Sequence, residues 1–285
     1  MSPRSIKTEA RYVDIGTVRL WVEAHGVGAP IVLVHDRGVD RRMWTPQTEA
    51  LSRDYRVIVY DQRGHGRSNR SGTEPYVPAA DLAALIAELD LDRIVVVGLA
   101  GGAARALELA VADPSRVAGV VLACPDVPGL RPAGFDADAT AAAELERLAP
   151  VLACLERMRT GEADADALVD ALLDDPAFPD AAHTQARELV RRMLHDNTAV
   201  YLDPPTEVAT QPPVADQLAD VRCPVLVLAR DAACGLERAA PNALIADVPR
   251  ARLVEIDARS LFVNLECPQA FEATAREFLT EVVGA

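Results

Sequence analysis

Aromatic residues and lysine are scarce in this sequence. Aromatic side chains make up 4% of the 285 residues, and Lys7 is the only lysine. The sequence has 43 acidic and 29 basic residues, which gives a formal net charge of −14. A surface this acidic repels phosphate backbones and anionic lipid, so we expect neither nucleic acid nor a membrane as a partner. The near-absence of lysine beside many alanines indicates a GC-rich genome, such as that of an actinobacterium.

Paired cysteines and long apolar runs are also absent. The five cysteines are widely spaced and include no C-x-x-C pair, so the sequence suggests neither a disulfide framework nor a zinc site. No apolar run approaches the roughly 20 residues that cross a membrane, and the first residues contain no apolar stretch of the signal-peptide type. We therefore expect a cytoplasmic protein with no metal and no cofactor.

The alternation of short β-branched runs with helical patterns predicts the fold class. A hairpin is expected over residues 12–24, and buried strands over 31–35, 57–61, 94–99 and 117–124. Helical patterns lie between and after them. Strands that alternate with helices favour an α/β fold with a parallel sheet and right-handed crossovers.

The pattern changes in the middle of the chain. Residues 128–213 contain no strand pattern but are rich in alanine, leucine and charged residues at helical spacing, interrupted by proline and glycine. Strand patterns resume at 224–229 and 252–256. We predict a core domain formed by residues 1–127 and 214–285, with a helical cap inserted as residues 128–213.

Three motifs resemble the α/β-hydrolase superfamily in content and order. Residues 32–38 (VLVHDRG) are similar to its oxyanion loop, with Asp36 where glycine is common. Residues 60–68 (YDQRGHGRS) resemble its D-x-R-G-x-G-x-S turn, and residues 95–102 (VVVGLAGG) its nucleophile elbow. The resemblance implies an α/β-hydrolase fold, with a mostly parallel eight-stranded sheet flanked by helices and an inserted helical cap.

The nucleophile position of this resemblance is occupied by alanine. The elbow pattern G-x-S-x-G becomes Gly-Leu-Ala-Gly-Gly here, and Ala100 stands where family members carry Ser, Asp or Cys. A methyl group has no lone pair with which to attack, and no general base can supply one. The chain is therefore not expected to be a serine hydrolase.

The acid and histidine positions of the catalytic triad also align with residues that can neither accept nor donate a proton. The resemblance puts Ala233 at the acid position, with Asp231 two residues earlier, and Leu261 at the histidine position; no histidine follows His195. We interpret the chain as an atypical, triad-less member, similar to the group that contains bottromycin-type peptide epimerases. Asp231 is the candidate acid or base, although its simpler role is to cap the next segment.

The resemblance leaves a pocket and two backbone donors. In the family the oxyanion is held by backbone N–H groups that correspond here to Gly101 and Arg37, and such donors could equally stabilise an enolate. Small or apolar replacements widen and dry the pocket, which suits a bulky, partly apolar small molecule or modified peptide. The candidate ligand-binding residues are His35, Asp36, Arg37, Ala100, Gly101, Asp126 and Leu261.

Three functions remain open at this point. The preferred hypothesis is a natural-product tailoring isomerase, an epimerase or a cyclase, that acts by enolate stabilisation or by folding its substrate in a dry pocket. The second is a catalytically inactive pseudo-hydrolase that binds a small molecule. The third is a hydrolase with rearranged catalytic residues. The sequence leaves the substrate and the oligomeric state open.

Overall fold

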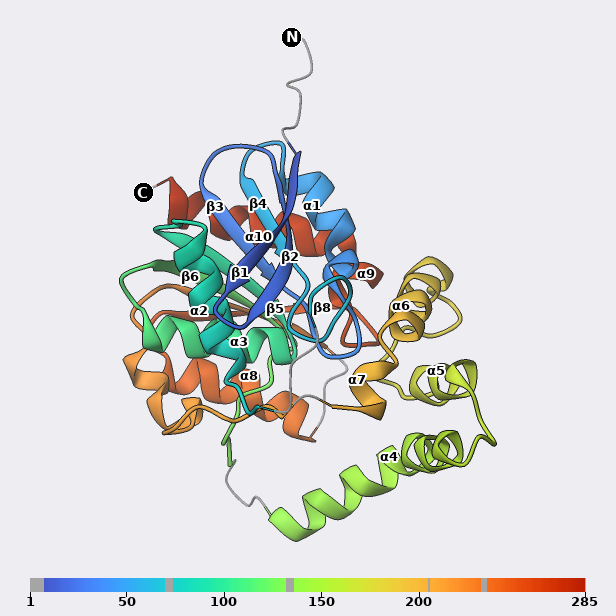
Figure 1. Ribbon diagram of the computed structural model, residues 1–285. Coiled ribbons are helices and arrows are strands. Elements are labelled where there is room, and N and C mark those ends of the chain that lie inside the picture. The colour runs from blue at the N-terminus through green and yellow to red at the C-terminus, as the bar shows by residue number, and fades with distance from the viewer. Residues whose placement is uncertain (1–7, 70–73, 132–135, 205, 232–234, 285) are drawn as a thin grey trace.

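A computed structural model describes residues 8–69, 74–131, 136–204, 206–231 and 235–284 (Figure 1). Its centre is one eight-stranded sheet in the order β1-β2-β4-β3-β5-β6-β7-β8. β2 pairs antiparallel with β1 and with β4, and the other neighbouring strands pair parallel. The predicted fold, a mostly parallel eight-stranded sheet flanked by helices, is confirmed. The strands are β1 Thr8–Ile15, β2 Val18–His25, β3 Pro30–Val34, β4 Arg56–Tyr60, β5 Ile94–Leu99, β6 Val117–Ala123, β7 Val225–Arg230 and β8 Ala251–Ile256.

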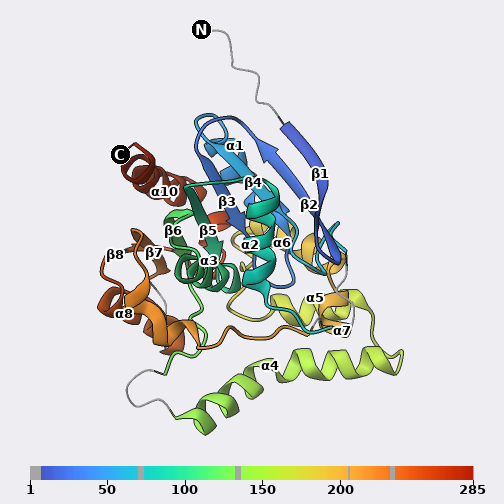
Figure 2. The same ribbon diagram turned by 60° about the vertical axis from the view of Figure 1, so that its left-hand side comes forward.

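Helices cover both faces of this sheet (Figure 2). Helices α2, α3 and α8 pack on one face, and α1 and α10 pack on the other. Strand β5 is consequently buried along its whole length, which explains why its sequence is a continuous apolar run rather than an alternating one. The helices of the core are η1 Arg41–Trp44, α1 Thr45–Leu51, α2 Pro78–Glu88, α3 Gly101–Ala112, η2 Val214–Asp220, α8 Gly235–Asp247, α9 Val263–Glu266 and α10 Pro268–Val283.

In the described residues between β6 and η2, where the sequence predicted a cap, the chain forms four helices. They are α4 Ala137–Arg159, α5 Ala165–Leu173, α6 Thr184–Asp196 and α7 Ala199–Leu202. Figure 1 shows them in series beside the sheet, with α4 outermost. Only two side chains of α4, Val151 and Cys154, are buried. The division into a core and a cap at residues 127/128 and 213/214 stays a prediction.

A buried asparagine joins the cap to two loops of the core. Asn197 follows α6 and is 2% exposed. Its Nδ2 donates to Asp40 Oδ2 at 3.0 Å, and its Oδ1 accepts from the backbone N–H of Gly66 at 2.7 Å. One amide therefore connects the end of α6 to the loop before η1 and to the turn after β4.

Replacing Asn197 with alanine tests this connection. The substitution leaves the buried carboxylate of Asp40 without one of its partners and removes the acceptor of the Gly66 N–H, so we expect the free energy of unfolding to fall by about 1–3 kcal/mol in chemical denaturation. The control is Asn69→Ala, because Asn69 is exposed and its recorded hydrogen bonds involve only its backbone. Equal losses in the two variants would contradict the assignment.

Within the described residues, no helix is both long and apolar enough to cross a membrane.

Candidate active site at the β5–α3 elbow

Ala100 forms a strained elbow between β5 and α3. Its backbone adopts φ 47° and ψ −113°, a conformation that costs a non-glycine residue of order 1–3 kcal/mol. The elbow is fixed from both sides, since Ala100 N donates to Ala123 O at 2.9 Å and Ala104 N donates to Ala100 O at 3.1 Å. A Cβ on Gly102 would lie 2.3 Å from Val34 O, so only glycine permits this close approach. The strained turn is therefore kept around a side chain that is only a methyl group.

The backbone N–H after the elbow is not free. Gly101 N donates to Asp36 Oδ1 at 3.0 Å. The backbone N–H of Arg37, the second expected donor, also lies close enough to the Asp36 carboxyl to lower its pKa. The expectation of two open oxyanion donors is therefore wrong. Asp36 stands where glycine is common in the family. Its side chain lies at both backbone N–H groups, so the protein's own carboxylate occupies the place expected for an oxyanion.

Asp36 is a half-buried carboxylate in a charged surrounding. Burial raises the pKa of Asp36, while the two backbone hydrogen bonds and the positive charge of Arg105 oppose the shift; the negative charge of Asp126 raises it further. A carboxylate with a raised pKa accepts a proton more readily than an ordinary aspartate does. Asp126 itself is exposed, and its backbone N–H lies 3.4 Å from Ala100 O.

Arg105 approaches the same space from one turn further along α3. It is 9% exposed, and its Nη2 donates to Glu207 Oε2 at 3.2 Å. A Cβ built on Gly101 would lie 2.8 Å from Arg105 Nη1 and 2.8 Å from Asp36 Oδ1, with no further non-bonded side chain as near. The guanidinium of Arg105 and the carboxylate of Asp36 therefore both lie close to Gly101, on the side where any other residue would carry its side chain.

The cap contributes a tyrosine that the sequence did not reveal. Tyr201 of α7 packs against the oxyanion loop, where a Cβ on Gly38 would lie 2.0 Å from its hydroxyl oxygen. Gly38 has φ +77°, so glycine suits both its backbone and this contact. Burial and the negative charge of Asp36 raise the pKa of Tyr201, which keeps the hydroxyl protonated as a donor.

His35 lies beneath the loop rather than in the site. It is fully buried, accepts from Gln62 N at 2.8 Å through Nε2 and contacts Asp36 O at 2.7 Å through Nδ1. Burial, together with the neighbouring His65, lowers the pKa of His35 to about 3, so the ring is neutral. His35 therefore positions the backbone of Asp36 and offers a ligand no exposed surface.

The remaining candidate residues are spread around the elbow. Leu261 is partly buried, and its N–H donates to Ala177 O, in the segment between α5 and α6, at 3.0 Å. Arg37 is exposed, and its Nη2 lies 3.7 Å from Glu207 Oε1. Asp231 is exposed at the end of β7. Ala233 lies outside the described residues, and among those described no group of three or more His, Cys, Asp or Glu could hold a metal ion.

Comparisons with known proteins define the family. A family model described as "Alpha/beta hydrolase family" matches residues 31–274, so the chain belongs to the α/β-hydrolase family. Among solved structures, the enol-lactonase from Burkholderia xenovorans LB400 superposes with a TM-score of 0.72 at 25% identity, over 95% of this chain and 100% of that one. A thermophilic esterase from Thermogutta terrifontis, with malate bound, gives 0.74 at 26% identity, over 96% and 99%.

Curated relatives match a shorter segment. A Caulobacter protein named as a carbamate hydrolase, RutD, is 40% identical over 110 residues, which are 36% of this chain and 41% of that protein. A Synechocystis protein named as a non-heme chloroperoxidase is 39% identical over 99 residues, 32% of this chain and 36% of that protein. The chain thus spans about two fifths of the length of these relatives.

The titration of Asp36 can be tested through protein stability. Because folding raises the pKa of Asp36, the folded state holds the proton more tightly than the unfolded state. The stabilisation is present at low pH and is lost as pH rises through the folded pKa. We expect the free energy of unfolding, measured by denaturation at several pH values, to fall less with rising pH in Asp36→Asn than in the unchanged protein.

The matched control for this measurement is Asp231→Asn, at an exposed aspartate. It should leave the pH dependence as it is. If Asp36→Asn also leaves it unchanged, or makes the loss of stability with rising pH steeper, the account of Asp36 fails.

Proposed function

We propose that this family member has given up triad hydrolysis and is an isomerase, an epimerase or a cyclase, that moves a proton at an acidified carbon of a small molecule or modified peptide. The observation that carries the proposal is the hydrogen bond from Gly101 N to Asp36. It places a basic group beside Ala100, where the family has its nucleophile. The alignment of Ala233 and Leu261 with the acid and histidine positions supports the same conclusion.

Asp36 is the proposed base. The C–H bond next to a substrate carbonyl breaks, its proton moves to a carboxylate oxygen of Asp36, and its electron pair moves to the carbonyl oxygen as an enolate. Arg105, which lies close to Gly101, and the hydroxyl of Tyr201, which lies close to Gly38, are the proposed donors to that oxygen. Return of the proton to the carbon completes an epimerisation or a double-bond shift.

Two alternatives have specific support. The names of the relatives, a carbamate hydrolase and an enol-lactonase, favour a hydrolase with rearranged residues, in which Asp36 would activate water. Against it, a tetrahedral oxyanion would have to displace the Asp36 carboxylate from the donors it occupies. A pseudo-hydrolase that only binds a ligand is favoured by the fact that Asp36 is already hydrogen-bonded.

Proton exchange provides the test of the base. We expect the protein to catalyse exchange of the α-hydrogen of peptidyl thioesters or related carbonyl compounds with deuterium from D₂O, followed by mass spectrometry. Asp36→Asn should lower the exchange rate by about 10²–10⁴-fold, the usual contribution of a general base. Tyr201→Phe should lower it less, because Arg105 remains. As the pH is lowered, protonation of Asp36 should reduce the exchange rate. Because the pKa of Asp36 is raised, this fall should occur at a higher pH than that at which an ordinary aspartate titrates.

The control is Asp231→Asn, which should keep its exchange rate. Loss of exchange in this variant but not in Asp36→Asn would move the base to Asp231. Binding of these compounds with no exchange in the unchanged protein would support the pseudo-hydrolase instead.

Restoring the nucleophile tests the loss of hydrolysis. We expect Ala100→Ser to gain no substantial activity on p-nitrophenyl acetate, because the new hydroxyl has no histidine to deprotonate it and the adjacent donors are occupied. A large gain that disappears in Ala100→Ser/Asp36→Asn would show that Asp36 works as a hydrolytic base, and would support the rearranged hydrolase.

A further inference from the structure

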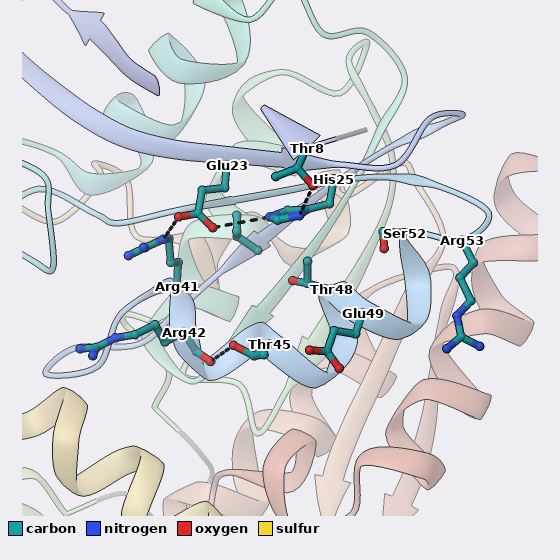
Figure 3. A pocket seen from close by; sticks show the side chains of 11 residues that line it. Thr8, Glu23, His25, Arg41, Arg42, Thr45, Thr48, Glu49, Ser52 and Arg53 are labelled. Atoms are coloured by element: carbon teal, nitrogen blue, oxygen red, sulfur yellow. Dashed lines mark hydrogen bonds and ion pairs between the residues drawn. The ribbon is translucent and has the colours of Figure 1, made fainter. Parts of the chain in front are cut away.

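A cavity of about 570 Å³ opens away from the elbow, between the β1–β2 hairpin and α1 (Figure 3). None of its lining residues belongs to α3 or to the segment 36–38. Its volume falls within the range of pockets that hold small molecules. Val59 is its only aliphatic lining residue, so most of the apolar part of its wall comes from the carbon atoms of polar and charged side chains.

Two hydroxyls face this cavity, one from Thr48 of α1 and one from Ser52, which caps the C-terminal end of that helix. Thr48 and Ser52 are one helical turn apart and therefore lie on the same side of the helix. They are 8% and 4% exposed. Among the described residues, neither hydroxyl has a hydrogen-bond partner. Both are therefore available to a ligand that enters the cavity.

The negative charge on the wall of the cavity is already compensated. Glu23 accepts from Trp21 Nε1 at 2.9 Å and from Arg41 Nε at 2.7 Å, and His25 Nε2 lies 3.5 Å from its other oxygen. The hydrogen bond with His25, followed by those with Trp21 and Arg41, lowers the pKa of Glu23 to about 2, against the effect of burial. Glu23 is therefore ionised but leaves little negative potential in the cavity.

The rim carries an exposed arginine, Arg53. No described residue forms an ion pair with it, Glu49 one turn earlier included, although its positive charge acts on the carboxyl of Glu272 and opposes the rise in that group's pKa that burial causes. The other two lining arginines are already paired, Arg41 with Glu23 and Asp61, and Arg42 with Asp40 and Asp196. Arg53 is therefore the lining cation that the anionic group of a ligand can reach without breaking an ion pair of the described residues.

From these contacts we propose that the cavity binds a small organic anion through a carboxylate or a phosphate group. Arg53 supplies the charge, and the hydroxyls of Thr48 and Ser52 supply hydrogen bonds to the oxygens. The site is separate from the elbow, and the inference does not rest on the function proposed there.

Inorganic phosphate and acetate are the probes, titrated into the full chain at constant pH and ionic strength with chloride as the balancing ion. Binding is followed by calorimetry and by NMR shifts of the threonine methyl groups, including Thr48. We expect saturable binding of at least one probe, and the stronger of the two identifies the group. Arg53→Gln should weaken it about tenfold, and Glu49→Gln should strengthen it, because a repelling charge is removed.

Arg192→Gln is the matched control, since Arg192 is another exposed arginine, outside the cavity, on α6. It should leave the affinity unchanged, and so should Asp36→Asn, which disables only the elbow. The proposal is overturned if neither probe binds saturably, if Arg192→Gln weakens binding as much as Arg53→Gln, or if Glu49→Gln fails to strengthen it. None of these results would bear on proton exchange at the elbow.

Discussion

The backbone geometry of residue 100 is the constraint from which the site follows. The chain leaves β5, turns through φ 47° and enters α3 at once, held by hydrogen bonds to β6 and within the first turn of the helix. This turn directs the N–H of Gly101 out of the sheet, towards the loop after β3. The hydroxyl of a nucleophile contributes nothing to that geometry. Alanine can therefore replace the nucleophile while the donor after it stays in place.

A donor that stays in place needs an acceptor, and Asp36 supplies one. In a hydrolase of this fold the donors wait for an oxyanion that forms only during the reaction. Here a permanent carboxylate accepts from Gly101, and the loop that bears it is fixed from beneath by His35. Burial at this position raises the pKa of Asp36 against the opposing effects of these hydrogen bonds and of Arg105, which lies on the other side of Gly101. In the proposed function, the alanine at the elbow and the carboxylate of Asp36 beside it act as two parts of one site.

The cap completes this arrangement from the other side. Tyr201 comes from α7 and lies over Gly38, while Glu207, beyond the cap helices, orients Arg105 through a charged hydrogen bond. Asn197 fixes the end of α6 against two core loops. The position of the cap is therefore coupled to the groups that would hold an enolate oxygen.

Much of the fold could be predicted from the sequence, because buried parallel strands give continuous apolar runs and the elbow has a short, distinctive motif. The prediction identified the strands of the sheet and the helical character of residues 128–213, but it missed α8, whose sequence from Gly235 contains Pro241 and lacks a clear apolar face. Ala100 could be placed because the motif is local.

The rest of the site depends on side-chain directions. Backbone motifs suggested that Gly101 and Arg37 were open donors, and nothing in the sequence shows that the Asp36 side chain folds back onto them. Tyr201 and Glu207 are separated from the motifs by the cap helices, and Arg105, although it lies one turn beyond the elbow, takes its direction from Glu207. Their contribution depends on how the cap packs, which no local pattern determines.

The pKa of the Asp36 carboxyl is the measurement that tests this account most directly. Carbon-13 NMR of the labelled protein follows the carboxyl carbon through a pH titration, and comparison with Asp36→Asn assigns the signal. The account predicts a pKa above the ordinary aspartate value of about 3.9. A pKa at or below that value would contradict it, because Asp36 would then be only a hydrogen-bonded loop residue and not a base.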